Sequence, residues 1–288
     1  MTSRSIIGID VGGTKIHVAH IKDDSVVAEL RVPTGADRAR EHIIKDLVDA
    51  IGSFMSPEVI GIGIGVPGLV DMEAGVIYNV SNIPAWTNFP IKEELESFFT
   101  VPVFIGNDAN CFVLGEKYFG HARGHKNVVG LTLGTGVGAG VIVNDALHVG
   151  NCSMAGEFGG IAHLDSDFEN YCSGKFFLHK YKMDAYELSQ KAANGDKAAL
   201  DIFREYGKHV GSLIQTILYS YGPDAIIIGG SLSKAFPYFE NGMLNTLDMF
   251  PHKVALETTV IEISDNPHIA VLGAGALTLS AKEAVFNP

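Results

Sequence analysis

The sequence predicts an α/β fold of two lobes, and three observations lead to this prediction. The chain has 288 residues, which is more than one compact core usually holds. Apolar strand-like runs alternate with segments of helical periodicity along most of its length. A strand, a glycine-rich turn and a second strand open each half of the chain. Two copies of one opening indicate a duplicated fold that holds a ligand between its halves.

Strands and helices alternate through the first half. Apolar, β-branched runs bounded by turn residues are typical of strands, and residues 36–54 carry aliphatic side chains at helical spacing. The strand before Asp10 leads through a glycine pair into another strand, which predicts a β-hairpin and not the strand-to-helix turn of a dinucleotide-binding unit. In chain order we expect strands at 6–9, 17–21, 26–32, 59–66 and 101–105, and helices at 36–54, 91–99 and 109–119.

The second half begins after a polar, glycine-bearing stretch at 120–126, which suits a crossing between domains. Beyond it we expect strands at 128–133, 139–143, 225–228 and 256–263, and helices at 198–221 and 269–285. The predicted domains are an N-terminal lobe over residues 1–120, completed by the C-terminal helix at 269–286, and a larger C-terminal lobe over residues 121–268.

The composition excludes several classes of partner. Hydrophobic residues make up 47% of the chain and charged residues 19%, and the formal net charge is −12. An acidic surface repels nucleic-acid phosphates and anionic lipids, so we expect no nucleic acid and no membrane as partners. No segment is apolar enough to span a bilayer, and the N-terminus lacks the pattern of a signal peptide. Cys111, Cys152 and Cys172 are widely spaced and odd in number, which argues against disulfides and favours a cytoplasmic protein.

Three glycine-rich turns follow expected strands. Backbone N–H groups converge on phosphate oxygens where no Cβ is in the way. One such turn is a weak signal, because a glycine-rich hairpin is often only a turn, but three together favour a nucleotide site. The candidate residues are Asp10, Gly12, Gly13, Thr14 and Lys15 in the first turn, Gly134, Thr135, Gly136 and Gly138 in the second, and Gly229 and Gly230 in the third.

These turns, with further motifs, resemble the ROK family of sugar kinases (repressors, open reading frames, kinases). The matching segments occur in the family's order at 7–15, 63–68, 106–110, 133–138, 155–159 and 228–231. The resemblance implies an actin-like ATPase fold of the ribonuclease H-like, hexokinase type, with an interdomain cleft in which ATP transfers its γ-phosphoryl group to a sugar hydroxyl. It also implies that the first two turns contact the phosphates, that Gly229 and Gly230 lie against the adenosine, and that the chain is a homodimer. Asp10 would lie near Mg²⁺, through water.

Asp108 is the candidate general base. Phosphoryl transfer requires mostly positioning and charge neutralisation, and a sugar hydroxyl also needs a proton acceptor. Asp108 follows an expected strand in a segment that matches the family's base. The alternative is that Asp108 caps the helix expected from Ala109, a common task for aspartate. The two roles are compatible.

The resemblance assigns further residues to the sugar. Asn107, Glu157 and Glu169 match positions that hydrogen-bond sugar hydroxyls, a task that suits carboxylates because each accepts several bonds. Asn82 resembles another sugar-proximal position, and Gly68 is expected to offer its backbone. The alternatives are solvated surface carboxylates for the glutamates and a turn asparagine for Asn82.

The sequence departs from the family at its zinc loop. Gly160 stands where most members carry a histidine, and no paired cysteines lie between Glu157 and Glu169. The set His163, Cys152 and Cys172 is unlike known zinc sites in its spacing, so we expect no structural zinc. The resemblance implies a hexose or N-acetylhexosamine as the substrate, phosphorylated at its 6-hydroxyl as by a glucokinase. Because the histidine's contact with the sugar is missing, the alternative is N-acetylmannosamine or fructose.

Three other functions compete with a kinase. A sugar-sensing repressor needs a DNA-binding module before the first glycine turn, which here begins at Asp10. A catalytically silent sugar-binding or regulatory protein would not need Asp108. A phosphatase or chaperone-like ATPase of the same fold uses water as the attacking group and needs no sugar site.

Overall fold

The computed structural model describes residues 4–80 and 82–286, except the side chains of Cys152 and of residues 282–286. Contacts divide the chain into two compact units. The first comprises Met1–Gly124, Ala146–Ala155 and Asn266–Pro288, and the second comprises His125–Asp145 and Gly156–Asp265. The short segment Ala146–Ala155 therefore groups with the first unit, although the sequence assigns it to the second lobe.

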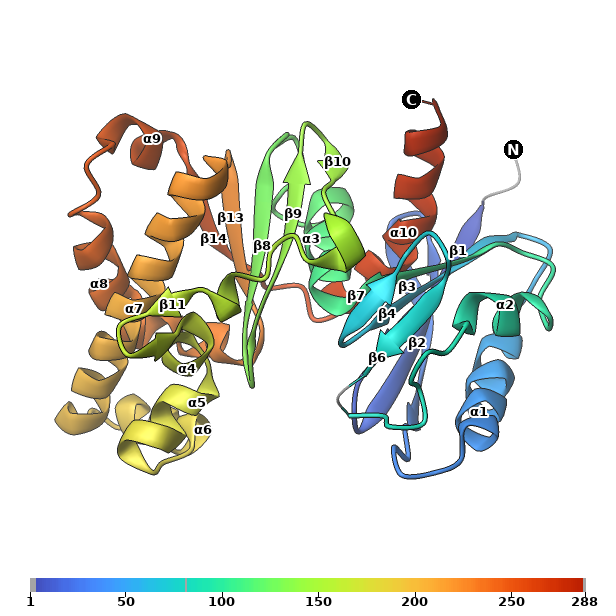
Figure 1. The fold of residues 1–288 in the computed structure, drawn as a ribbon, viewed down its shortest axis with the longest axis horizontal. Coiled ribbons are helices and arrows are strands. Elements are labelled where there is room, and N and C mark those ends of the chain that lie inside the picture. The colour runs from blue at the N-terminus through green and yellow to red at the C-terminus, as the bar shows by residue number, and fades with distance from the viewer. Residues whose placement is uncertain (1–3, 81, 287–288) are drawn as a thin grey trace. The chain divides into compact units, whose positions relative to one another are not determined.

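A mixed sheet forms the centre of the first unit (Figure 1). Its strand order is β3 (Ser25–Pro33), β2 (Lys15–Lys22), β1 (Ser5–Val11), β4 (Val59–Val66) and β7 (Val103–Asn107). β1 pairs antiparallel with β2 and parallel with β4, and β4 pairs parallel with β7. Because β1, β4 and β7 run in the same direction, their carboxyl ends meet at one edge of the sheet, where ligand sites of α/β folds lie.

Helices cover both faces of this sheet. α1 (Arg40–Gly52) and α2 (Ile91–Glu96) share a buried cluster with Ile7 and Ile9 of β1. α10 (Ile269–Phe286) packs on the opposite face, and α3 (Asp108–Phe119) packs beside it. A Cβ on Gly8 would lie 2.0 Å from the carbonyl oxygen of Val271, and a Cβ on Gly63 would lie 1.8 Å from that of Ala274. These two glycines therefore let α10 rest directly on the strands.

A small hairpin extends the first unit beyond β4. It consists of β5 (Leu69–Asp71) and β6 (Val76–Asn79), which pair antiparallel. The 3-10 turn η1 (Asn151–Ser153) packs on it, because the buried Ser153 hydroxyl donates a 3.0 Å hydrogen bond to the Val70 carbonyl. The preceding β10 (Ala146–Leu147) belongs to the same returning segment.

The second unit repeats this strand pattern. β9 (Val137–Val143), β8 (Val128–Leu133), β13 (Ala225–Gly229) and β14 (Val260–Ile263) follow one another in the sheet, with β8–β9 antiparallel and the remaining pairs parallel. The order matches β2-β1-β4-β7 of the first unit. α7 (Lys197–Tyr221) and α8 (Phe236–Leu247) pack on each other and share the core of this unit. The remaining elements are η2 (Phe158–Gly160), β11 (Ala162–His163), β12 (Ser166–Asp167), α4 (Phe168–Cys172), α5 (Gly174–Phe176), η3 (Phe177–Tyr181), α6 (Ala185–Ala193), η4 (Ser231–Ala235) and α9 (Lys253–Thr258).

The two sheets with their helices confirm the predicted α/β class. One predicted strand, at 256–263, is wrong in its first part, because Leu256 belongs to α9 and the strand begins at Val260. α9 buries none of its side chains, so its apolar run lacks the one-sided pattern of a packed helix. Among the described residues, no helix is both long and apolar enough to cross a bilayer.

Candidate active-site residues in the two units

The first glycine turn is a closed hairpin held by a residue that the sequence analysis missed. The Gly12 N–H donates to the Lys15 carbonyl at 2.9 Å, which closes the turn between β1 and β2. Thr34 ties the end of β3 to it, because its buried hydroxyl donates to the Gly12 carbonyl at 2.6 Å and its N–H to the Thr14 carbonyl at 2.9 Å. Thr14 and Lys15 remain exposed. The turn is therefore fixed in shape and presents a hydroxyl and a cation to solvent.

Asn82 lies against this turn. A Cβ on Gly13 would come within 2.8 Å of the Asn82 Cβ and within 3.2 Å of its amide nitrogen. Only a glycine at position 13 leaves room for this amide. The structure thus brings Asn82 and the first turn together.

Asp10 and Asp108 belong to the carboxyl edge of the same sheet. Asp10 pairs in register with Gly65 of β4, and β4 in turn pairs with β7, which ends immediately before Asp108. The half-buried Asp10 has its pKa raised to about 6, first by burial and then by the negative charge of Asp108. Asp108 itself is exposed. Two carboxylates in different environments therefore share this edge.

Asn107, and not Asp108, occupies the N-cap position of α3. The Asn107 Oδ1 accepts a 2.9 Å hydrogen bond from the Ala109 N–H, and its Nδ2 donates to the Gly68 carbonyl at 3.0 Å. Asp108 is the first helical residue, and its Oδ1 accepts from the same N–H at 2.9 Å. Gly68 has φ +126°, a conformation open to glycine, and a Cβ there would lie 2.2 Å from the Asn79 carbonyl oxygen. Asn107 thus links Gly68 to the start of α3 and fixes the backbone that carries Asp108.

The second glycine turn joins β8 and β9. The Gly134 N–H donates to the Gly136 carbonyl at 3.0 Å, and the Thr132 hydroxyl donates to the Gly138 carbonyl at 3.2 Å. The Gly174 N–H, from the start of α5, donates to the Gly134 carbonyl at 2.8 Å. Thr135 is exposed at the tip. The α4–α5 segment therefore supports this turn through a hydrogen bond to its backbone.

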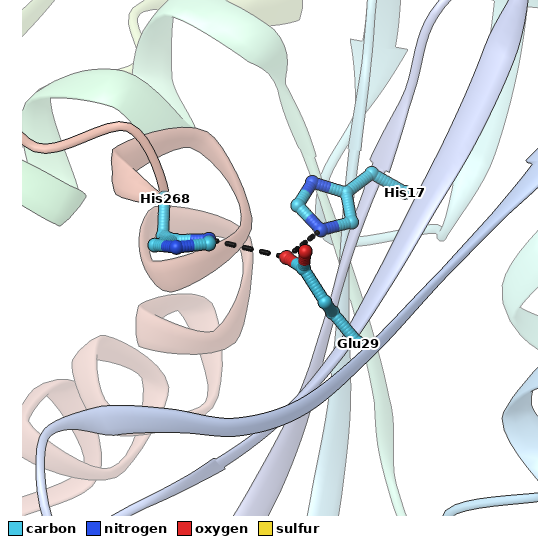
Figure 2. A group of neighbouring side chains, drawn as sticks. All are labelled: His17, Glu29 and His268. Atoms are coloured by element: carbon cyan, nitrogen blue, oxygen red, sulfur yellow. Dashed lines mark hydrogen bonds and ion pairs between the residues drawn. The ribbon is translucent and has the colours of Figure 1, made fainter.

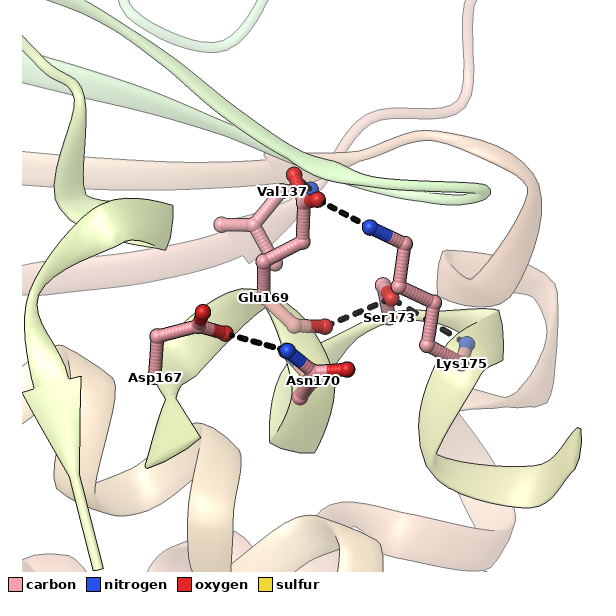
Figure 3. Close-up of polar contacts among 6 residues, drawn as sticks. All are labelled: Val137, Asp167, Glu169, Asn170, Ser173 and Lys175. Atoms are coloured by element: carbon pink, nitrogen blue, oxygen red, sulfur yellow. Dashed lines mark hydrogen bonds and ion pairs between the residues drawn. The ribbon is translucent and has the colours of Figure 1, made fainter. Parts of the chain in front are cut away.

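Glu169 of α4 holds this turn from beneath (Figure 3). Its Oε1 forms an ion pair with the Lys175 Nζ, and its Oε2 accepts a 3.4 Å hydrogen bond from the Val137 N–H. A Cβ on Gly136 would lie 2.9 Å from Oε2, so the carboxylate fits under a glycine. Short helices place these groups, because the Asp167 carboxylate caps α4 through the Asn170 N–H at 2.8 Å and Ser173 caps α5.

Glu157 lies near Glu169 in the second unit. It precedes η2 and is open to solvent on one side. The partial loss of solvent around its carboxyl raises its pKa, and the negative charge of Glu169 adds to this effect. The glycines around it pack on β9, because a Cβ on Gly156 would lie 2.2 Å from the Ala139 carbonyl oxygen. Gly160, which follows at the position of the family's histidine, is exposed, and a Cβ there would meet no atom within 4 Å.

A pocket of about 570 Å³ lies beside the second turn. Gly134 and Thr135 line it together with Lys175, and the other walls come from α6, η4 and α8. Gly229 and Gly230 are absent from its lining, where the next residue, Ser231, takes part. Gly230 adopts φ +87°, and a Cβ there would lie 2.3 Å from the Leu133 carbonyl oxygen, so it sets the path of the chain. Residues that the sequence does not single out complete the lining: Gly174, Leu178, Asp184, Ala185, Tyr186, Ser189, Gln190, Ala193, Leu232, Lys234, Ala235 and Tyr238.

The alternative zinc set consists of His163, Cys152 and Cys172, and the side chains of His163 and Cys172 have different surroundings in the structure. His163 Nε2 lies 3.0 Å from His209 Nδ1, and its ring stacks on Phe168. Cys172 is fully buried, and burial raises the pKa of its thiol. The side chain of Cys152 lies outside the described part of the chain. No metal group containing His163 or Cys172 occurs among the described side chains.

Comparison with known proteins places the chain in a family. The ROK family profile matches residues 6–281. A glucokinase of Thermotoga maritima is 30% identical over 267 residues, which cover 82% of this chain and 84% of that enzyme. A xylose repressor of Bacillus subtilis is also 30% identical, over 82% of this chain and 67% of the repressor. The crystal structure of a ROK family glucokinase from Streptomyces griseus, in complex with glucose and AMPPNP, superposes with a TM-score of 0.78 and 26% identity, and covers 95% of this chain and 98% of that one.

These matches confirm the resemblance drawn from the motifs and the actin-like ATPase fold that it implies. They extend over nearly the whole described chain and include both sheets with their glycine turns. The protein belongs to the ROK family.

Proposed function

We propose that this protein is an ATP-dependent sugar kinase in which Asp108 is the general base. The observation that carries the proposal is the pair of carboxylates at the edge of the first sheet, where Asp10 is half-buried and Asp108 is exposed. In the proposed reaction Asp108 accepts the proton of the sugar hydroxyl, whose oxygen bonds to the γ-phosphorus of ATP. The bond from that phosphorus to the β–γ bridging oxygen breaks, and ADP leaves.

The second unit is proposed to bind the nucleotide. The 570 Å³ pocket is of the size that takes a small ligand, and it combines aromatic walls from Tyr186 and Tyr238 with the cations of Lys175 and Lys234. A nucleoside fits this mixture of ring surface and polar groups. The phosphates then fall on the turn at 134–138, where the glycines place no Cβ over the backbone. The first turn, with Thr14 and Lys15, is proposed to contact the phosphates as well.

Mg²⁺ suits the chemistry of Asp10. The raised pKa of this carboxyl reflects burial next to a second negative charge, and a divalent cation offsets both effects. Asp10 would hold the ion through water, because Mg²⁺ gives up its hydration shell reluctantly. When bound, the ion supplies charge neutralisation to the phosphates. The contribution of the chain itself is to hold the Asp10 side chain in place near the end of β1.

The sugar is proposed to lie near Asn107 and Glu157. The Asn107 amide already hydrogen-bonds the Gly68 carbonyl and the Ala109 N–H. It therefore fixes the backbone around Asp108, in addition to any contact that it makes with the sugar. Asn82 and the Gly68 backbone complete the proposed sugar contacts of the first unit. Glu169 has a double role in the proposal, because its carboxylate already holds Lys175 and the second turn. Glu157 is the freer of the two glutamates.

We propose a hexose or N-acetylhexosamine as the substrate, with the 6-hydroxyl as the acceptor. The names of the relatives support a glucokinase-like activity, and the glucose in the Streptomyces griseus structure supports a hexose. The glycine at position 160 supports a different preference, for N-acetylmannosamine or fructose, because a family histidine is missing there. The xylose repressor among the relatives supports, as the alternative of another class, a silent sugar-binding or regulatory protein.

A coupled assay of ADP release separates these possibilities. ATP and Mg²⁺ are supplied with glucose, fructose, mannose, N-acetylmannosamine or N-acetylglucosamine in turn. We expect ADP release that depends on one or more of these sugars. ADP release without sugar indicates a water-using ATPase instead, and sugar binding without turnover indicates the silent binder.

A further inference from the structure

A cluster of two histidines and one glutamate, none of them assigned to the proposed reaction, lies on the first unit (Figure 2). His17 comes from β2, Glu29 from β3, and His268 from the residue before α10. His17 pairs in register with Arg31 and Ala19 with Glu29, so His17 and Glu29 are diagonal neighbours on adjacent strands. Side chains in this relationship reach one another across a sheet. α10 packs on the same sheet and brings His268 to them.

The three side chains point their donor atoms at one place. His17 Nε2 lies 2.8 Å from Glu29 Oε2, and His268 Nδ1 lies 3.2 Å from the same oxygen. One donor atom from each residue lies within 4.8 Å of the other two. In a tetrahedral zinc site with bonds of about 2.0–2.1 Å, neighbouring ligand atoms are roughly 3.4 Å apart. The two distances to the Glu29 oxygen lie within about 0.6 Å of that spacing. The two nitrogens lie no more than 4.8 Å apart, so rotation of the side chains is needed to close the site.

The contacts within the cluster leave a nitrogen unused. His268 Nδ1 is shielded from solvent and has no hydrogen-bond partner of good geometry among the described residues, although the carboxylate oxygen is near. The Glu29 oxygen already serves His17. Without a metal, the His17 Nε2–H donates to Glu29 Oε2, and a shift of that proton to Nδ1 frees the Nε2 lone pair for a cation. The cluster therefore offers two imidazole nitrogens and an ionised carboxylate.

One neighbouring charge opposes a cation. Arg31 Nη2 lies 3.4 Å from Glu29 Oε2, and its side chain is half exposed. An exposed arginine of this kind is held weakly and can turn into solvent. Removal of Arg31 should therefore favour a cation in the cluster, whereas removal of any donor should abolish its binding.

We propose that His17, Glu29 and His268 bind one divalent transition-metal ion, with zinc preferred. Two imidazoles and a carboxylate are ligands that zinc accepts, and water would complete the coordination on the exposed side. The ion would join β2, β3 and the start of α10, two residues after the point at which the chain returns to the first unit at Asn266. The expected consequence is a first unit that is more stable with zinc than without it. The proposal does not depend on the proposed kinase activity.

The experiment is a zinc titration of the full chain after treatment with a chelator, followed by calorimetry, with Co²⁺ absorption spectra as a second probe. We expect wild-type protein to bind zinc, to give a Co²⁺ spectrum with nitrogen and oxygen ligands, and to melt at a higher temperature when zinc is present. His17→Gln, Glu29→Gln and His268→Gln should each weaken binding by more than about 100-fold, because even the loss of groups that only orient a ligand costs about 10- to 100-fold. Arg31→Gln should bind zinc at least as tightly as wild type.

Matched controls separate this cluster from other histidines. His42→Gln, at an exposed position on α1, should bind zinc as wild type does. The melting temperature of each variant without zinc shows whether it folds, so a loss of binding in a folded variant supports the proposal. Absence of zinc binding by the wild type would overturn it, as would full affinity in the three donor variants. Loss of binding in His163→Gln or His209→Gln with full affinity in the donor variants would also overturn it and assign the ion to that pair.

Discussion

Asp10 and Asp108 are coupled at the carboxyl edge of the first sheet, where the charge of Asp108 adds to burial in raising the pKa of Asp10 to about 6. Asp10 is the last but one residue of β1 and pairs with Gly65, while Asp108 is the first residue of α3 after the N-cap Asn107. Two carboxylates in unlike environments are suited to different tasks, one toward a cation and one toward a proton.

This coupling predicts how stability depends on pH. The pKa of Asp10 is higher in the folded protein than its ordinary value of 3.8, so the folded state holds this proton more tightly than the unfolded state. Proton binding by Asp10 therefore stabilises the folded state below about pH 4. This stabilisation falls as the pH rises from about 4 to about 6, and above about pH 6 the ionised carboxyl destabilises the folded state by a constant amount. The cost at neutral pH is at most about 3 kcal/mol, from a shift of roughly two pKa units.

Asp10→Asn should remove this cost. In the absence of Mg²⁺ the variant should melt above wild type at pH 7, and the difference should shrink as the pH is lowered through 6 toward 4. Melting curves across this pH range measure it, with the exposed Asp37→Asn as a control that should leave the difference near zero. A constant difference at all pH values would contradict the raised pKa of Asp10.

Thr34→Val should loosen the first glycine turn. The substitution keeps the side-chain volume but leaves the Gly12 carbonyl without its 2.6 Å hydrogen bond. We expect the free energy of unfolding to fall by about 1 kcal/mol and the KM for ATP to rise. Thr34→Ser retains the hydroxyl and should recover most of both properties in urea unfolding and in kinetics. Equal behaviour of the two variants would argue against a role for this hydrogen bond.

Glu169→Gln should affect ATP more than stability. The ion pair with Lys175 is about one-third exposed on both sides, so we expect its loss to lower the free energy of unfolding by less than about 1 kcal/mol. The second turn loses its support, and the KM for ATP should rise. A double-mutant cycle with Lys175→Met tests this, because the two substitutions should be less than additive. Additive effects on KM would show that the two residues act separately.

Gly160→His should change the sugar preference without harming the fold. The position is exposed and a Cβ there meets no atom within 4 Å, so we expect the free energy of unfolding to change by no more than about 0.5 kcal/mol. The imidazole restores the residue that most family members carry. KM values across the sugar panel should shift while the KM for ATP stays constant, and Gly160→Ala should leave both unchanged. An unaltered panel would remove Gly160 as a determinant of specificity.

The sequence predicts those elements of the fold that have a recognisable local pattern of residues. Both glycine turns are hairpins where the strand–glycine–strand pattern places them, and the aliphatic spacing of residues 198–221 corresponds to α7. The strand predicted at 256–263 takes in the last three residues of α9, because this helix buries no side chain and so shows no helical face. The short α4 and α5 have too few residues to display a period, and their caps, Asp167 and Ser173, are visible only afterwards.

The candidate site also contains residues that local motifs predict and residues that only tertiary packing brings together. Asp10 and Asn107 stand in motifs that can be recognised one segment at a time. Thr34 is an ordinary threonine at the end of a strand until β3 folds back on the first turn. Tyr186 and Tyr238 line one pocket from helices about 50 residues apart in the sequence, and no pattern in either segment indicates that the two will meet. Contacts of this kind arise from tertiary packing and leave no local signal.

The most direct test of Asp108 as the general base is the rate of sugar phosphorylation by Asp108→Asn, together with the affinity of this variant for the sugar. The variant keeps the size and the helix position of the side chain but cannot accept the hydroxyl proton. We expect turnover to fall by about 100- to 10,000-fold while the sugar dissociation constant stays within several-fold of wild type. Turnover close to that of wild type would contradict the assignment of Asp108 as the base.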